Sequence, residues 1–262
     1  MSGVDTSTGS RHLNRYIVGV ALVGLVAACV LWVVAPPASP GIGALITLGV
    51  LAVIGRSFPV RFQRKGETQG FNFIEGVFVA ALFVLPYGLI PLVVGGGVLV
   101  GHLATRDLRK LTFNTGQTLL WAAVAVAMFQ AVAGGQPDPL SVRGLVGATA
   151  ATAALNIVSL AAMAELIRRL NGRGRLETIR EVSQLQVLTW GGNLSFGLVL
   201  ALLMERSPYA GFLATTLMLG LSLGYRGFAN ALEERRRNGL LEGVVFTLAD
   251  VNSSTDSVET FL

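Results

Sequence analysis

The sequence is poor in charged residues and in cysteine. Only 13% of its 262 residues are Asp, Glu, Lys or Arg, and 52% are hydrophobic, whereas about a quarter of the residues of a soluble domain are charged. Its one cysteine, Cys29, lies in an apolar run, which excludes a disulfide framework and a cysteine-based metal site. His102 stands alone near the end of an apolar run, where a capping role explains it better than a metal does. We therefore expect an integral membrane protein without a metal or a cofactor.

The sequence is rich in long apolar runs. A helix that crosses a bilayer needs about 20 mostly apolar residues, and about eight runs approach that length between Pro-rich and Gly-rich breaks. They cover residues 16–34, 41–54, 73–85, 89–103, 115–132, 145–167, 188–204 and 209–225. The sequence thus predicts an all-α, polytopic membrane bundle of about eight transmembrane helices over residues 16–228, after a cytoplasmic tail at 1–15. The second, third and fourth runs are short.

The positions of the basic residues predict the topology. If the N-terminus is cytoplasmic, every Lys and Arg except Arg143 and Arg206 falls on the cytoplasmic side, as expected for a multi-pass protein of a bacterial inner membrane. An even number of helices places both termini there. This distribution explains the net charge of +5 without a nucleic-acid partner. The longest loop, residues 56–70, alternates in polarity and is predicted to form a small hairpin at the inner surface.

The last apolar run continues into a charged segment without a proline. Tyr209 begins a predicted helix that leaves the lipid and extends through residue 237. Apolar residues then recur at steps of three and four, which favours a cytoplasmic linker helix over 229–262 and a weak parallel coiled coil, and hence a homodimer. The alternatives are a helix–turn–helix lead-in to a soluble domain and a frayed amphipathic tail. The residues expected to transmit a signal are Arg226, Glu233, Glu234, Arg235, Leu241 and Leu248.

Two apolar runs begin with the same polar pattern. Asn72 is followed by Glu75, and Asn114 by Gln117. In a capping box the first residue caps the helix and the residue three positions later bonds back to it, so the pattern predicts two helix starts. The other interpretation is that Glu75 is a buried proton or cation site, because carboxylates inside a membrane are usually functional.

The sixth run carries a polar stripe. Thr149, Thr152, Asn156 and Ser159 are spaced by three and four residues, so they share one helix face that should point into the bundle. Hydrogen bonding between helices explains such a face. The alternative is a small ligand pocket, with Asn156 and Asn193 as the best candidates for ligand contact. The further candidates are Thr152, Ser159, Glu75 and Gln117. Two further patterns are structural: Glu165 should pair with the arginines one turn later, and the spacing of Gly97 and Gly101 should allow close helix contact.

Several short motifs together resemble a known type of membrane module. They are Phe58-Pro59-Val60, Phe113-Asn114-x-x-Gln117, Asn193-Leu194, Ser207-Pro208, Tyr225-Arg226 and the run from Glu233 to Arg237. In this order they are similar to the multi-helix N-terminal membrane sensor region of bacterial, actinobacterial-type signalling proteins. In that family, GAF, GGDEF, EAL or HD-GYP output domains follow the membrane region. The resemblance implies a sensor whose last helix controls such a domain. The sequence itself contains no output-domain motif, so we expect that domain in cis beyond residue 262 or in trans.

Two other classes of function compete with this interpretation. The first is a substrate-binding membrane subunit of a small-molecule transporter, whose pocket would be built by the polar sixth run and the Gly-rich fourth run. The second is a membrane enzyme. Glu233 and Glu234 suggest the Glu-Glu-x-x-x-Arg motif of intramembrane proteases, but residue 238 is asparagine. No nucleophile motif or Asp-rich metal motif is present either, so we do not expect an enzyme.

Overall fold

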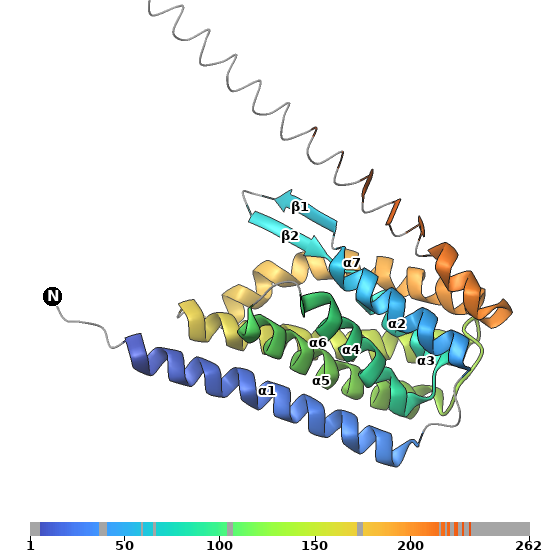
Figure 1. Cartoon of the computed structure of the whole chain (residues 1–262), viewed down its shortest axis with the longest axis horizontal. Helices are drawn as coiled ribbons and strands as arrows, with labels where there is room; N and C mark the ends of the chain where they lie inside the picture. Colours follow the sequence, from blue (N-terminus) through green and yellow to red (C-terminus); the bar gives the residue numbers. More distant parts are fainter. Residues whose placement is uncertain are drawn as a thin grey trace, which may run out of the picture. The chain divides into compact units, whose positions relative to one another are not determined.

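The computed structural model describes residues 6–36, 41–58, 60–64, 67–103, 107–171 and 175–214, with scattered positions from 216 to 231. These residues fall into two compact units. The first unit contains the helical bundle, within residues 1–59 and 71–218 (Figure 1). The second contains most of a β-hairpin, within residues 60–70, and the described positions beyond residue 218.

The first unit is built from helices joined by short connections. They are α1 (Thr6–Val34), α2 (Ile42–Ser57), α3 (Ile74–Val84), α4 (Ile90–His102), α5 (Leu108–Ala133), α6 (Val142–Asn171) and α7 (Arg175–Arg206). Two 3₁₀ helices, η1 (Tyr87–Leu89) and η3 (Pro208–Ala210), precede α4 and follow α7, and residues 211–214 are again helical. The first seven predicted apolar runs fall largely within these helices, and the described part of the eighth is mainly helical, so the prediction of a helical fold is confirmed.

The hairpin consists of β1 (Val60–Arg64) and β2 (Glu67–Phe71), which form a two-stranded sheet. It confirms the hairpin that the loop at 56–70 predicts. The proposed linker helix at 229–262, apart from residue 231, and the residues expected to transmit a signal lie outside the described residues.

The helix ends follow the local chemistry of the chain. Gly134 ends α5 in the left-handed conformation, with φ of 70°, which glycine adopts without steric cost. Asp107 begins α5, because its Oδ1 accepts hydrogen bonds from the backbone N–H groups of Arg109 at 3.1 Å and Lys110 at 3.2 Å. These hydrogen bonds, above all the one from the backbone of Lys110, hold the pKa of Asp107 below its ordinary value.

Replacing Asp107 by alanine is expected to lower the thermal stability at neutral pH. A depressed carboxyl pKa contributes stability that is present above the ordinary pKa and is lost as the pH falls through the depressed one. The difference in Tm between D107A and the wild type should therefore shrink between pH 7 and about pH 3. The uncharged amide introduced by D107N can still cap the helix, so the deficit of that variant at pH 7 should be smaller than that of D107A, and it too should shrink toward pH 3 as the wild-type carboxylate is protonated. Circular dichroism melts at both pH values test this, and a pH-independent deficit in D107A would contradict it.

The prediction of about eight membrane-crossing helices is not supported. Among the described residues, Arg11–Val34, Leu108–Ala133 and Val142–Leu170 are long and apolar enough to cross a membrane. The apolar helices α2, α3 and α4 contain 16, 11 and 13 residues. At a rise of about 1.5 Å per residue they extend roughly 24, 17 and 20 Å, less than the hydrocarbon core of about 30 Å.

The short helix α3 is enclosed by its neighbours. Every residue from Val77 to Leu82 is fully buried, and α3 contacts α2, α4, α5, α6 and α7. The ring of Phe78 meets the ring of Trp121 on α5 edge to face, with a centroid distance of 5.2 Å. An apolar run of this length that is enclosed by protein forms a core helix, which needs no contact with lipid.

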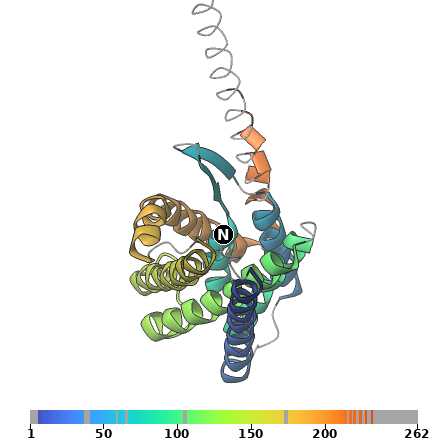
Figure 2. The ribbon, with the colours of Figure 1, turned by 90° about the vertical axis from the view of Figure 1, so that its left-hand side faces the viewer.

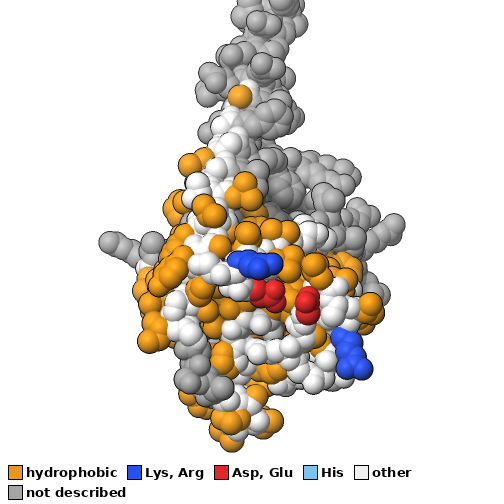
Figure 3. Space-filling model, turned by 90° about the vertical axis from the view of Figure 1, so that its right-hand side faces the viewer, with side chains coloured by type: hydrophobic (Ala, Val, Ile, Leu, Met, Phe, Trp, Pro, Cys, Tyr) orange, Lys and Arg blue, Asp and Glu red, His pale blue; other side chains and the backbone are white. Residues whose placement is uncertain are grey.

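The outside of the bundle is apolar along α1. Leu22, Val26 and Val33 are 57%, 60% and 76% exposed. Figure 2 shows the bundle end on, and Figure 3 shows the opposite end, where α1 ends; hydrophobic and uncharged side chains cover most of that end. The described charged side chains lie near helix ends or in connections. An apolar exterior with charges at the ends is what a bundle in a membrane requires, and it fits a membrane protein.

Glycines let two pairs of helices approach closely. A Cβ atom added to Gly97 on α4 would overlap Ala52 on α2, and one added to Gly101 would lie 3.1 Å from the Cβ of Arg56. The predicted close contact at these two glycines is therefore confirmed. A second contact of this kind joins α1 and α5, where Gly24 faces the backbone of Gly116. Small residues are the usual means of close packing between membrane helices.

Candidate functional site

One polar contact between side chains in the interior joins α3 to α7. Asn193 on α7 is 1% exposed, and its Nδ2 donates hydrogen bonds to Oε2 of Glu75 at 2.9 Å and to the backbone carbonyl of Asn72 at 3.2 Å. Gly76 follows Glu75 and has no side chain, which allows the ring of Phe196 to lie against it. Asn193 and Glu75 were both predicted as ligand contacts, and the structure brings them together.

This contact contains unused hydrogen-bonding capacity. The side-chain oxygens Oδ1 of Asn72 and of Asn193 are buried and have no partner, and neither has the indole Nε1 of Trp190, one turn before Asn193. None of the ion pairs among the described residues includes Glu75. Buried polar atoms are rarely left unsatisfied. We call this group of residues the Glu75–Asn193 site.

The capping prediction is wrong at Glu75. The residue at the N-cap position of α3 is Phe73, which forms no side-chain capping bond, and the carboxyl group of Glu75 accepts a hydrogen bond from Asn193 instead. A contact with another helix has replaced the local bond that the sequence pattern indicates.

The capping prediction is also wrong at Gln117. Because Asp107 already begins α5, Asn114 and Gln117 lie inside the helix. The Nε2 of Gln117 donates at 3.0 Å to both the backbone carbonyl and the hydroxyl oxygen of Ser159 on α6. Gln117 is 5% exposed, so this pair joins α5 to α6 in the interior, away from Asn193.

The polar stripe of α6 does not form one site. Thr152 is fully buried, whereas Thr149 is exposed. The hydroxyl of Thr149 donates to Leu145, that of Thr152 to Ala148 at 2.7 Å, and the amide of Asn156 to the carbonyl of Thr152 at 2.8 Å. These groups bond to carbonyls of their own helix, so the expectation that the whole stripe faces the interior is wrong for Thr149.

A second polar cluster joins three helices. The Nε of Arg56 on α2 donates to Nε2 of His102 on α4 at 2.7 Å, and a terminal guanidinium nitrogen lies against the same atom. The Nδ2 of Asn114 on α5 lies 3.1 Å from it. His102 Nε2 accepts the hydrogen bond from Arg56 Nε, so this ring nitrogen carries no proton. No carboxylate among the described residues pairs with Arg56, so this cluster is rich in donors and positive charge.

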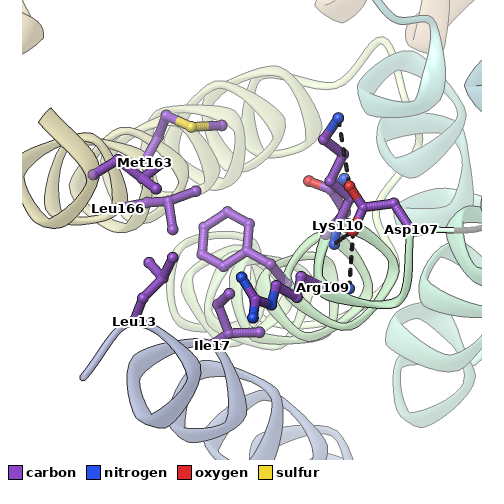
Figure 4. Close-up of a pocket in the computed structure, with 10 residues that line it drawn as sticks. Leu13, Ile17, Asp107, Arg109, Lys110, Met163 and Leu166 are labelled. Carbon is purple, nitrogen blue, oxygen red and sulfur yellow. Dashed lines mark hydrogen bonds and ion pairs between the residues drawn. The ribbon is translucent and has the colours of Figure 1, made fainter. Parts of the chain in front are cut away.

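A cavity of about 390 Å³ lies between α1, α5 and α6. We call it the α1–α5–α6 cavity. Its apolar walls and its charged rim are both visible in Figure 4. The lining residues are Leu13, Ile17, Phe113, Met163, Leu166 and Leu170 on the apolar side and Asp107, Arg109, Lys110 and Asn114 on the polar side. The described residues contain no group of three His, Cys, Asp or Glu side chains that could hold a metal ion.

The walls of this cavity are fixed by polar contacts. The hydroxyl of Tyr16 donates to the carbonyl of Ala162 at 2.8 Å, and the guanidinium of Arg169 lies 4.7 Å from the centre of the Tyr16 ring. Glu165 pairs with Arg168 at 2.6 Å and with Arg169 at 2.7 Å, which confirms the pairing that the sequence predicts. The two contacts of Tyr16 join α1 to α6 beside the cavity, whereas the ion pairs of Glu165 lie within α6.

Comparison with known proteins adds no relative. Neither protein-family models, nor curated protein sequences, nor solved structures match this chain. The interpretation of its sites therefore depends on the geometry described above. Arg226, Glu233, Glu234, Arg235, Leu241 and Leu248 lie outside the described residues, so their expected role in signal transmission stays a prediction.

The sequence did not reveal the cluster of Arg56, His102 and Asn114, nor the cavity. Each of the three polar residues lies near the end of a different apolar run, where a separate interfacial role explains it. The useful signal was the pair Gly97 and Gly101, because close approach of α4 to α2 places His102 beside Arg56.

Proposed function

We propose that the chain is an integral membrane sensor and transmitter module of a bacterial signal-transduction protein. In this proposal it lies in the plasma membrane, with both termini cytoplasmic, as a homodimer. The three long helices cross the lipid, and the shorter apolar helices complete a polytopic bundle around the enclosed α3. The module passes a signal through its last helix to a cytoplasmic output domain, in cis or in trans, and performs no catalysis itself.

The observation that carries this proposal is the contact between Glu75 and Asn193. The two residues join α3, at the centre of the bundle, to α7. The chain leaves α7 through η3 directly into the helical residues 211–214. A change at Glu75, such as gain of a proton or binding of a polar ligand, removes or reverses a hydrogen bond to α7. The start of the last helix is then the next element to move, provided that the bundle has two arrangements that differ in this bond.

The distribution of charge supports the proposed topology. Arg11, Arg15 and Lys110 lie near one set of helix ends, whereas Arg143 and Arg206 lie near the other. Arg168 and Arg169 in the last turn of α6 extend the basic set. An excess of Lys and Arg marks the cytoplasmic side.

Disulfide crosslinking of single cysteines at Leu241 and Leu248, with Cys29 replaced by serine, tests this function in membranes. Symmetric crosslinked pairs should form, and Glu75→Gln should change their rate of formation at least about three-fold, since it alters the bond to Asn193. The matched control is Glu205→Gln, because Glu205 is exposed at the far end of α7. A lack of symmetric pairs, or equal rates in all three proteins, would refute the transmitter.

The transporter subunit remains the alternative proposal. The sequence predicts that Thr152, Asn156 and Ser159, together with the Gly-rich α4, form the pocket of such a subunit. The α1–α5–α6 cavity is lined by other residues, so a transported substrate bound there would meet mainly apolar walls. Copurification of a small molecule with the bundle would favour this function.

A further inference from the structure

We propose that the α1–α5–α6 cavity binds one anionic phospholipid, with part of an acyl chain between α1 and α6 and the phosphate at Arg109 and Lys110. This inference concerns a different site from the Glu75–Asn193 contact and does not depend on the sensor function. The cavity combines two surfaces that rarely occur together, an apolar wall and a basic rim, and this combination matches the two halves of a phospholipid.

The apolar half of the cavity is lined by side chains of α1, α5 and α6. Leu13 and Ile17 on α1 face Met163 and Leu166 on α6 (Figure 4). Phe113 on α5 also lines the cavity. A volume of about 390 Å³ is within the range of small-molecule sites. Such apolar walls favour hydrocarbon over water, with about 0.8 kcal/mol for each buried methylene group.

The polar half of the cavity carries an excess of positive charge. Arg109 and Lys110 line it together with Asp107, whose carboxylate lies 3.6 Å from the ammonium of Lys110. Asn114 lines it as well and contacts His102, the acceptor for Arg56. Two cationic side chains and one carboxylate therefore line this half, which leaves it with a net positive charge. A phosphate group would balance this charge and accept hydrogen bonds from the cationic donors. Basic pockets between membrane helices are suited to anionic headgroups.

The occupant is a lipid and not a free anion, because the apolar lining is the larger part of the cavity. Inorganic phosphate would meet only the rim. A zwitterionic lipid would place a second, positive group beside Arg109 and Lys110, which like-charge repulsion disfavours. Phosphatidylglycerol, with one negative charge and no positive group, is the probe that fits both halves.

Native mass spectrometry of the purified full-length chain tests the proposal by titration with phosphatidylglycerol, phosphatidylcholine or inorganic phosphate. We expect one phosphatidylglycerol per chain to bind at least about five-fold more tightly than phosphatidylcholine. The double variant Arg109→Gln/Lys110→Gln should weaken phosphatidylglycerol binding about ten-fold. The matched control Arg143→Gln/Arg206→Gln removes the same charge at the other helix ends and should leave the affinity unchanged.

Two cavity-filling variants test the apolar half. Met163→Trp should abolish the one-to-one binding while helicity stays at the wild-type value, and Leu13→Phe is the milder substitute if Met163→Trp does not fold. Equal affinity for both lipids would overturn the proposal. So would equal losses in the two double variants, full binding in a folded cavity-filled variant, or competition by inorganic phosphate at equal concentration.

Discussion

Asn193→Leu is expected to lower the free energy of unfolding by about 3 kcal/mol, which corresponds to a fall of roughly 6–12 °C in Tm. Leucine has a similar size but removes the amide that donates to Glu75 at 2.9 Å and to the carbonyl of Asn72. The carboxyl group of Glu75 and the carbonyl oxygen of Asn72 then lie in the interior without this hydrogen-bond donor. An unsatisfied buried carboxyl group costs more than the net contribution of the bond itself. Thermal unfolding in detergent, followed by circular dichroism, measures the effect.

Asn156→Leu is the matched control for this experiment. Its amide bonds only to the carbonyl of Thr152, in its own helix and partly exposed, so the same substitution should cost less than about 1 kcal/mol. The double variant Glu75→Leu/Asn193→Leu adds a stricter test. Removing Glu75 as well takes away the orphaned carboxyl group and leaves only the Asn72 carbonyl without this donor, so the double variant should be more stable than Asn193→Leu alone. If the double variant is no more stable, the bond between Glu75 and Asn193 is not the source of the effect.

The helices could be predicted from the sequence because hydrophobic runs and their breaks are local properties. Pro36, Pro86 and Gly134 mark ends that the structure confirms. The number of membrane crossings could not be obtained in the same way. The apolar run around α3 satisfies its backbone and side chains against other helices, and a sequence does not distinguish burial in protein from burial in lipid when both surroundings are apolar.

The polar sites were harder to predict because their partners come from distant parts of the chain. The sequence pattern at Asn72 and Glu75 is compatible with a capping box, yet Glu75 bonds to a residue 118 positions away. Likewise, Gln117 meets Ser159 only because α5 packs along α6. The list of candidates was useful nevertheless: Glu75, Asn193, Gln117 and Ser159 each contact another helix, in two separate pairs.

Gly24→Ala is expected to destabilise the bundle by about 3 kcal/mol, although alanine is normally the better helix former. The added Cβ would overlap the carbonyl oxygen of Gly116 and lie 3.1 Å from the amide nitrogen of Leu120. These are backbone atoms of α5, so no side-chain rotation relieves the overlap and the two helices must separate. Since Ile17 and Phe113 on these helices are buried in one cluster, separation also exposes apolar surface between α1 and α5.

Gly19→Ala on the same helix is the matched control, because a Cβ there meets nothing within 4 Å. It should be neutral or should stabilise the protein by up to about 1 kcal/mol, since alanine restricts the unfolded chain. Gly116→Ala should reproduce the effect of Gly24→Ala, because its Cβ would overlap the backbone of Ala21 from the other side. Thermal melts of the three variants suffice for the comparison. Similar Tm values for Gly24→Ala and Gly19→Ala would mean that α1 does not approach α5 through Gly24 and Gly116. In that case α1 and α5 would not be held together beside the α1–α5–α6 cavity.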